Sequence, residues 1–147
     1  QGPLGAFFLR DDTQNPIIAM AGGTGFAPIK AMLEDAFYKE ITRPIHFYWG
    51  ARSRRDLYLN DLPESWIEKY PHFRYTPVLS EPAPDDDWQG RTGFVHTVVA
   101  QDYADLSQHQ VYLSGPPAMI DAGKTEFFNQ GLPDDQLFYD SFDYAIE

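Results

Sequence analysis

Short apolar stretches alternate along the chain with longer segments whose apolar residues recur at helical spacing. Five of the short stretches are rich in branched and aromatic residues and have the length of ordinary strands. Residues 17–21 (Ile-Ile-Ala-Met-Ala) are apolar throughout, which is typical of a strand covered on both faces. The pattern predicts β-strands at residues 16–21, 44–50, 73–79, 109–114 and 136–140.

Four intervening segments have the features of helices. The segment 27–39 is rich in Ala, Met, Leu and Phe at helical spacing, and Val95, Val98 and Val99 form one stripe of a later segment. Pro117 suits the first turn of a helix, and Gly131 suits a helix stop. We therefore expect helices at residues 27–39, 62–70, 93–102 and 117–130.

Regular alternation of strands and helices indicates an α/β fold with a doubly wound parallel sheet. Right-handed crossovers then give five strands in the order 3-2-1-4-5, numbered along the chain, with helices on both faces. Ligands of such sheets bind at the carboxyl ends of the strands, where the strand order reverses. The predicted crevice therefore lies just after residues 21 and 114.

The first fourteen residues have a different character. Gly2-Pro3-Leu4-Gly5 is rich in turn formers, residues 6–10 resemble a strand, and residues 11–15 form a polar connector. We interpret residues 1–14 as the tail of a preceding domain with its connector, and residues 15–147 as one domain of ordinary size. Because the chain does not begin with Met, we expect it to be a piece of a longer protein.

Composition and charge narrow the classes of function. The 147 residues contain no cysteine, which excludes disulfides, thiol nucleophiles and cysteine-held zinc or iron–sulfur clusters within them. A net charge of −11 argues against a nucleic-acid partner. No apolar run approaches the ~20 residues of a membrane span and no secretory signal is visible, so we expect a cytoplasmic location and no membrane partner. The four histidines share no metal-ligand spacing, and we predict no metal site; they are His46, His72, His96 and His109.

Candidate chemistry begins with a glycine-rich loop between the first predicted strand and the first predicted helix. A pyrophosphate needs backbone N–H donors at close range, which glycine permits, and a helix N-terminus adds a favourable dipole. The loop lacks the Lys-Ser/Thr pair of nucleotide hydrolases and has a proline where the usual dinucleotide fingerprint has its third glycine. The alternative is a structural turn without a ligand. The loop is Gly22-Gly23-Thr24-Gly25-Phe26-Ala27-Pro28.

A second loop follows the fourth predicted strand and faces the first loop across the predicted crevice. A small residue, a glycine and two prolines give a rigid, open surface just before the amides of a helix N-terminus. Taken alone, the loop could equally be an ordinary turn. It is Ser114-Gly115-Pro116-Pro117-Ala118-Met119.

Two further residues follow the remaining central strands. Gly50 ends the second predicted strand and places Arg52 where it can meet a phosphate or a ribose, the alternative being a free surface arginine. Glu81 follows the third predicted strand, where an acid can accept a hydrogen bond from a ribose 2′-hydroxyl and repel a 2′-phosphate. The alternative for Glu81 is a loop acid without a role.

In combination, these motifs resemble the NAD(P)-binding domain of the ferredoxin–NADP reductase superfamily. Within it, the chain is most similar to the branch of CDP-6-deoxy-glucoseen reductases, oxygenase reductases and NAD(P)H–flavin reductases. The motifs occur in order over essentially the whole chain, which makes them more specific together than singly. They are Gly2-Pro3-x-Gly5-x-Phe7, Ala21-Gly22-Gly23-Thr24-Gly25-Phe26-Ala27-Pro28, Tyr48-Trp49-Gly50-Ala51-Arg52, Trp88-x-Gly90-Arg91-Thr92-Gly93, Ser114-Gly115-Pro116-Pro117-x-Met119 and Phe138-x-Asp140-Ser141-Phe142.

The resemblance implies a cofactor contact for each loop. The first loop would hold the pyrophosphate, Arg52 would touch the phosphates or a ribose, and residues 115–119 would border the nicotinamide and its ribose. Phe142 would lie near a flavin ring, and residues 2–8 would be the last segment of a flavin domain. The dinucleotide contacts would come from Gly22, Gly23, Thr24, Gly25, Pro28, Gly50, Arg52, Gly115, Pro116, Pro117 and Met119.

Two departures from the family pattern bear on chemistry and specificity. Ser114 stands where many members have a cysteine near the reacting carbon, which makes it the candidate catalytic residue. Ser80-Glu81-Pro82 lacks the basic residues that NADP-preferring members carry after this strand, which favours NADH over NADPH.

The implied function is hydride transfer from NADH, or NADPH, to an FAD held mainly by a domain absent from this chain. Electrons would then pass to an iron–sulfur centre or a partner protein, and the chain alone would be inactive. Two alternatives stay open: a free-flavin reductase, and a regulatory nucleotide-binding module without a redox role.

Overall fold

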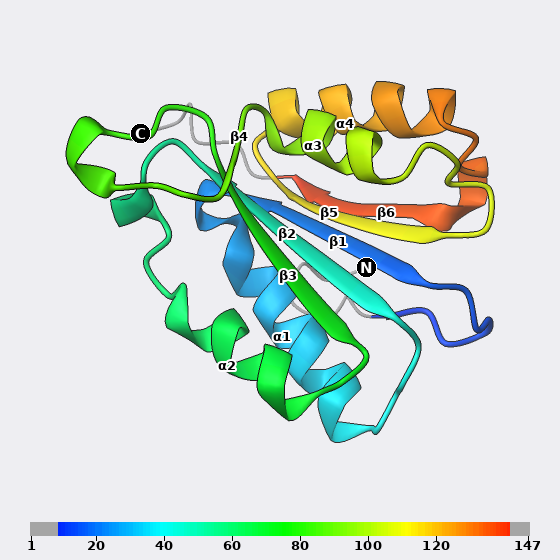
Figure 1. The fold of residues 1–147 in the computed structure, drawn as a ribbon. Coiled ribbons are helices and arrows are strands. Elements are labelled where there is room, and N and C mark those ends of the chain that lie inside the picture. The colour runs from blue at the N-terminus through cyan, green and yellow to red at the C-terminus, as the bar shows by residue number, and fades with distance from the viewer. Residues whose placement is uncertain (1–8, 142–147) are drawn as a thin grey trace.

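In the computed structural model, which describes residues 9–141, strands and helices alternate along the chain. The strands are β1 (Ile17–Gly22), β2 (Ile45–Ala51), β3 (Phe73–Leu79), β4 (Arg91–Thr92), β5 (Gln110–Gly115) and β6 (Leu137–Ser141). The α-helices are α1 (Phe26–Tyr38), α2 (Asp61–Lys69), α3 (Val95–Asp102) and α4 (Pro117–Asn129). Over this range all strand pairs are parallel, and the sheet order is β4-β3-β2-β1-β5-β6 (Figure 1).

The five predicted strands are confirmed within one residue of their expected bounds, and they lie in the predicted order. The predicted number of strands is wrong, because β4 adds a sixth strand at the edge of the sheet. It is two residues long and pairs Arg91 and Thr92 with Val78 and Leu79 of β3. A strand this short has no hydrophobic period of its own, so only its pairing with β3 defines it.

The predicted helices are also confirmed, within one residue of their expected bounds except at the start of α3. Helix α3 begins at Val95 rather than at residue 93. Gly93 has φ +114° and its N–H donates to the Leu79 carbonyl oxygen at 3.0 Å, so it turns the chain from β4 toward the helix. A positive φ is incompatible with a right-handed helix, which explains the later start.

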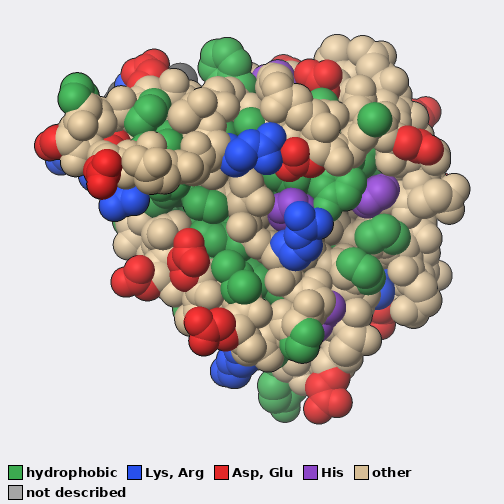
Figure 2. Space-filling model, in the orientation of Figure 1, with side chains coloured by type: hydrophobic (Ala, Val, Ile, Leu, Met, Phe, Trp, Pro, Cys, Tyr) green, Lys and Arg blue, Asp and Glu red, His purple; other side chains and the backbone are tan. Residues whose placement is uncertain are grey.

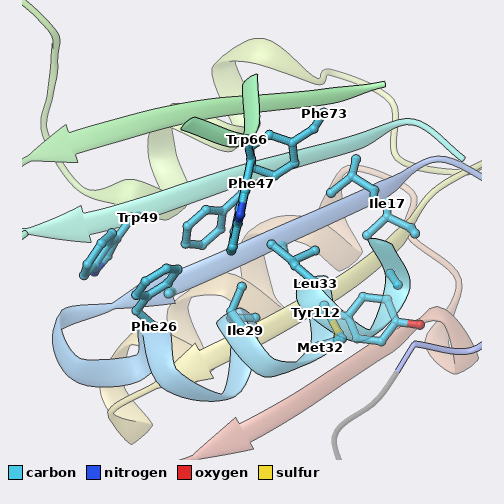
Figure 3. Close-up of a cluster of buried hydrophobic side chains, with 14 of the residues drawn as sticks. Ile17, Phe26, Ile29, Met32, Leu33, Phe47, Trp49, Trp66, Phe73 and Tyr112 are labelled. Carbon is cyan, nitrogen blue, oxygen red and sulfur yellow. The ribbon is translucent and has the colours of Figure 1, made fainter. Parts of the chain in front are cut away.

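Helices cover both faces of the sheet, as expected, with α1 and α2 on one side and α3 and α4 on the other (Figure 1). The side chains of β1 alternate between the two cores: Ile17, Ala19 and Ala21 belong to one cluster, and Ile18 and Met20 belong to the other. This division explains why the strand is apolar throughout. The first cluster is shown in Figure 3 and includes Phe26, Ile29, Leu33, Phe47 and Trp49.

The strand order reverses at β1, which pairs with β2 on one side and with β5 on the other. The next strands, β3 and β6, extend the sheet outward in opposite directions. The segments after β1 and β5 therefore meet at the point where ligands bind in open α/β sheets.

The amino-terminal segment is described from Leu9, which is buried in the first core cluster. Most of the predicted strand at residues 6–10, and the predicted flavin-domain tail at residues 2–8, lie outside the described residues. Leu9 and Arg10 do not form a strand.

On the face shown in Figure 2, acidic side chains are scattered around the molecule and do not form one patch. Among residues 9–141, no helix is long and apolar enough to cross a membrane.

Candidate functional site

A cleft of about 1010 Å³ opens at the carboxyl ends of the central strands. Its walls come from five places: the loop after β1, the segment after β2, Ser80 after β3, the turn into α3 and the start of α4. This volume is at the upper end of the roughly 300–1,000 Å³ range of small-molecule and cofactor sites. The cleft is therefore large enough for an extended cofactor such as a dinucleotide.

The structure brings seven of the predicted site residues into this cleft. They come from both glycine-bearing loops and from the end of β2, which shows that the two predicted loops face a common space. The seven are Gly22, Gly23, Thr24, Gly50, Arg52, Pro116 and Met119.

Six other predicted residues lie behind the lining or beside it, and Phe142 lies outside the described residues. Gly25 and Gly115 are buried behind the lining, and Pro28 is half-buried on α1. Pro117 and Glu81 are exposed without lining the cleft. Ser114 is fully buried at the end of β5.

The glycines allow the two loops to pack closely. A Cβ at Gly22 would lie 2.4 Å from Met119 Sδ, and a Cβ at Gly25 would lie 2.2 Å from the Ser114 carbonyl oxygen. Behind the loops, a Cβ at Gly115 would lie 2.7 Å from Met119 Cε. The end of the Met119 side chain can move, but the Ser114 carbonyl is backbone, so a side chain at Gly25 would force the loop after β1 away from the end of β5.

Each loop leads directly into a helix. The loop after β1 forms a short 3-10 turn (Gly23–Gly25) that continues into α1, and Pro116 precedes the first residue of α4. Neither α1 nor α4 has an acidic residue in its first turn. The partial positive charge of both helix N-termini therefore faces the same end of the sheet, where it favours an anion.

The charged side chains of the cleft add to this effect. Arg52 and Arg55 line the cleft together with a single carboxylate from the same segment, Asp56. The cleft is thus locally cationic in a chain whose net charge is −11. A ligand carrying phosphate groups suits this arrangement best.

Several lining residues were missed by the sequence analysis. The main ones are Arg55, Tyr58, Phe94 and His96. Phe94 is 69% exposed, and its ring stacks on that of His96 with centroids 6.0 Å apart. The motif around Gly93 signalled this segment, but its place at the cleft depends on the pairing of β4.

Val95 shows how this segment is held against β2. A Cβ at Gly50 would lie 2.7 Å from Val95 Cβ, so the glycine at the end of β2 makes room for the first residue of α3. Gly50 therefore has a packing role in addition to lining the cleft.

Ser114 lies beneath the cleft surface. Its Oγ is buried and has no hydrogen-bond partner, and the residue pairs in register with Asp140 of β6. Burial raises the pKa of the Asp140 carboxyl above its ordinary value. Because Ser114 does not line the cleft and its Oγ is buried, its hydroxyl does not face a ligand bound there.

Glu81 lies next to the cleft through backbone contacts. Its N–H donates to the Arg52 carbonyl oxygen at 2.8 Å, and the N–H of Ser80 donates to the Ala51 carbonyl oxygen at 2.9 Å. Ser80 lines the cleft, whereas Glu81 is exposed beside it. The carboxylate thus comes from a residue adjacent to the cationic wall.

The oxidoreductase NAD-binding domain family matches residues 19–125, from β1 into α4. The chain belongs to this family. The match confirms the resemblance to the NAD(P)-binding domain of ferredoxin–NADP reductase-type proteins.

Relatives of this NAD-binding domain are longer proteins. CDP-6-deoxy-L-threo-D-glycero-4-hexulose-3-dehydrase reductase of Yersinia pestis is 44% identical over 142 residues, which are 97% of this chain and 42% of the relative. The phenol 2-monooxygenase reductase component DmpP of Pseudomonas sp. (strain CF600) is 36% identical over 147 residues, which are 99% of this chain and 42% of the relative. The crystal structure of Amycolatopsis cytochrome P450 reductase GcoB has a TM-score of 0.86 at 31% identity, and the match covers 96% of this chain and 42% of GcoB. The chain therefore spans about two fifths of the length of these relatives.

Proposed function

We propose that this chain binds NADH in the cleft and presents it to an FAD that is held mainly by another domain of the same protein. The observation that carries the proposal is the meeting of two glycine-bearing loops, each leading into a helix, beside Arg52 and Arg55. This arrangement suits a diphosphate, and it lies where the strand order reverses.

Each wall of the cleft has a distinct role in the proposal. Gly22, Gly23 and Thr24 hold the pyrophosphate, while Gly25 and Pro28 shape the loop from behind. Arg52 neutralises phosphate charge. The second loop, from Gly115 through Pro116 and Pro117 to Met119, borders the nicotinamide. Since Ser114 is buried, we assign it a supporting place under this loop.

The nicotinamide and the flavin supply the redox chemistry, a hydride transfer from C4 of one to N5 of the other. The residues of this chain bind the dinucleotide, fix its orientation and exclude water on one side. In this proposal Phe142 lies at the flavin side, and residues 1–14 are the end of the flavin domain with its connector.

The names of two similar proteins support a proposal for the electron acceptor. They are named as reductases of a dehydrase and of a monooxygenase system. By analogy, the whole protein passes electrons to an iron–sulfur centre or a partner protein, and we place it in the cytoplasm. A free-flavin reductase and a non-redox regulatory module are the competing functions.

Anaerobic reduction of the flavin-loaded full-length protein tests the proposal. NADH is expected to bleach the flavin absorbance, and Arg52→Gln is expected to raise the NADH concentration needed for half-maximal reduction. Lys39→Gln, which changes an exposed cation at the end of α1, is the matched control. Absence of bleaching with both NADH and NADPH would refute the redox function.

The preference for NADH rests on Glu81. A carboxylate beside the cleft repels the 2′-phosphate of NADPH, and between exposed groups this repulsion amounts to about 0.5–1 kcal/mol. Glu81→Gln is therefore expected to improve the affinity for NADPH relative to NADH by roughly 2- to 5-fold.

Titration of both dinucleotides into the full-length protein measures this ratio. Glu68→Gln is the control, because Glu68 is an exposed acid on α2 that does not line the cleft. A wild-type protein that prefers NADPH, or a ratio unaffected by Glu81→Gln, would remove Glu81 as the discriminating residue and leave the dinucleotide site intact.

A further inference from the structure

The indole of Trp49 lies directly against the loop that follows β1. Its Nε1–H donates a hydrogen bond to the Gly23 carbonyl oxygen at 2.9 Å. Trp49 is fully buried on β2, on the side of the sheet covered by α1, as Figure 3 shows. A side chain of the neighbouring strand therefore reaches across to the backbone of the glycine loop.

This hydrogen bond acts at an exposed residue of the loop. Gly23 has φ +55°, and no heavy atom beyond Gly23 and its chain neighbours lies within 4 Å of the place where its Cβ would be. The peptide unit is planar and trans, so its carbonyl and the following N–H point in opposite directions. Fixing the Gly23 carbonyl toward Trp49 therefore also fixes the direction of the Thr24 N–H.

Trp49 is itself held by rings from two other segments. It stacks on Phe26, the first residue of α1, with centroids 4.3 Å apart and planes inclined by 23°. Its edge meets Tyr58, which lines the cleft, with centroids 5.4 Å apart and planes at 87°. One indole thus contacts the glycine loop, the helix that follows it and a residue that lines the cleft.

We propose that Trp49 is a positioning residue for the dinucleotide: its indole N–H sets the orientation of the Gly23–Thr24 peptide that receives the pyrophosphate. The inference rests on the proposed function, because it needs a diphosphate in the cleft. Trp49 does not itself line the cleft, so its effect is transmitted through the Gly23 carbonyl.

Trp49→Phe in the flavin-loaded full-length protein separates the hydrogen bond from the packing, since a phenyl ring can still stack on Phe26. The Kd for NADH is expected to rise roughly 5- to 20-fold, because the Gly23 carbonyl loses its donor and the peptide can rotate. The rate of flavin reduction at saturating NADH is expected to stay within about twofold. A general loss of packing would be expected to lower the rate of flavin reduction as well, so weaker binding at an unchanged rate separates the two explanations.

Trp66→Phe is the matched control. Trp66 belongs to the same core cluster and is 5% exposed. Its rings contact Phe37 and Phe73 and lie 6.4 Å from the ring of Phe26, but the indole that donates to the Gly23 carbonyl is that of Trp49. The same chemical change there is expected to leave the Kd for NADH unchanged.

A second measurement uses the unmodified protein. The indole N–H resonance of Trp49, assigned by triple-resonance experiments on the wild type, is expected to shift on saturation with unreactive NAD⁺. The resonance of Trp66 is expected to stay in place. This readout keeps the inference falsifiable if Trp49→Phe folds poorly.

The outcomes distinguish the inference from the function it rests on. If NADH reduces the wild-type protein but Trp49→Phe binds it equally well, or the Trp49 resonance does not move, the positioning role is overturned and the proposed function stands. If the wild-type protein neither binds nor is reduced by NADH or NADPH, both are overturned.

Discussion

Gly25 lies so close to Ser114 that a Cβ on Gly25 would come within 2.2 Å of the Ser114 carbonyl oxygen. The backbone of Gly25 has φ −65°, which any residue can adopt. The requirement for glycine here is therefore steric, and it comes from a backbone atom that cannot rotate away. This contact joins the loop after β1 to the end of β5.

The contact makes Gly25→Ala strongly destabilising. Overpacking against rigid backbone typically costs 1–3 kcal/mol, and we expect about 3 kcal/mol here because strand β5 itself has to shift. Gly23→Ala is the contrasting variant: it meets no atom within 4 Å, but its φ of +55° strains an alanine by about 1 kcal/mol. Urea unfolding measures the loss of unfolding free energy in both variants, provided that the dependence of this free energy on urea concentration is the same as in the wild type. Equal losses for the two variants would contradict the steric argument.

The sequence predicted the central sheet because its signals are local. Residues of β1 are apolar on both faces, and the other four strands recur between helical segments with recognisable ends. The rule of right-handed crossovers then determined their order. Strand β4 could not be found this way, since Arg91 and Thr92 carry no period and become a strand only by pairing with Val78 and Leu79.

The same distinction holds for the cleft. Its glycine loops follow predicted strands and were found, whereas Phe94 and His96 reach the cleft through a segment whose path depends on β4 and on the positive φ of Gly93. The burial of Ser114 also could not be read from its motif. It results from packing between neighbouring strands, which a linear pattern does not contain.

His46 is a second place where tertiary packing determines chemistry. It is 4% exposed on β2, its Nδ1 lies 2.7 Å from Tyr103 Oη and its Nε2 lies 2.8 Å from Thr76 Oγ1. Burial, reinforced by the positive charge of Arg74, lowers the pKa of His46 to about 4, while Asp102 opposes the shift. The native protein therefore holds this imidazole neutral.

Stability is expected to fall on acidification through this histidine. Between pH 6.5 and 4 the unfolded chain binds a proton at His46 that the folded chain does not, so the stabilisation is complete above pH 6.5 and is lost as pH drops. The shift from the usual value near 6.5 corresponds to about 2–3 kcal/mol by pH 4.5. His46→Gln removes this titration, so the free energy of unfolding is expected to depend less steeply on pH than in the wild type. Urea unfolding of the wild type and of His46→Gln at pH 7 and pH 4.5 gives the change in unfolding free energy with pH for each protein. An identical change in both would rule out His46 as the cause.

Arg43 ties the amino-terminal connector to the sheet. The Arg43 residue is 3% exposed. Its guanidinium donates to the Asn15 carbonyl oxygen at 2.8 Å and to the Arg10 carbonyl oxygen at 2.7 Å. A further donor reaches the side-chain oxygen of Gln110 on β5. The Arg10 N–H in turn donates to Tyr112 Oη at 2.7 Å. The connector is thus held by one buried cation rather than by strand pairing.

Arg43→Met keeps most of the side-chain length but leaves these acceptors without their donor. Each buried acceptor without a partner costs about 1–3 kcal/mol, and because connector carbonyls can turn to water we expect a total near 3 kcal/mol. Arg43→Lys keeps the charge but cannot span the same acceptors with a planar fork, so an intermediate loss is expected. Lys39→Met, at an exposed i,i+4 ion pair with Asp35, is expected to cost under about 0.5 kcal/mol. Urea unfolding ranks the three variants, and amide hydrogen exchange at residues 11–15 should accelerate most in Arg43→Met. Unchanged exchange there would mean that packing around Leu9 holds the connector instead.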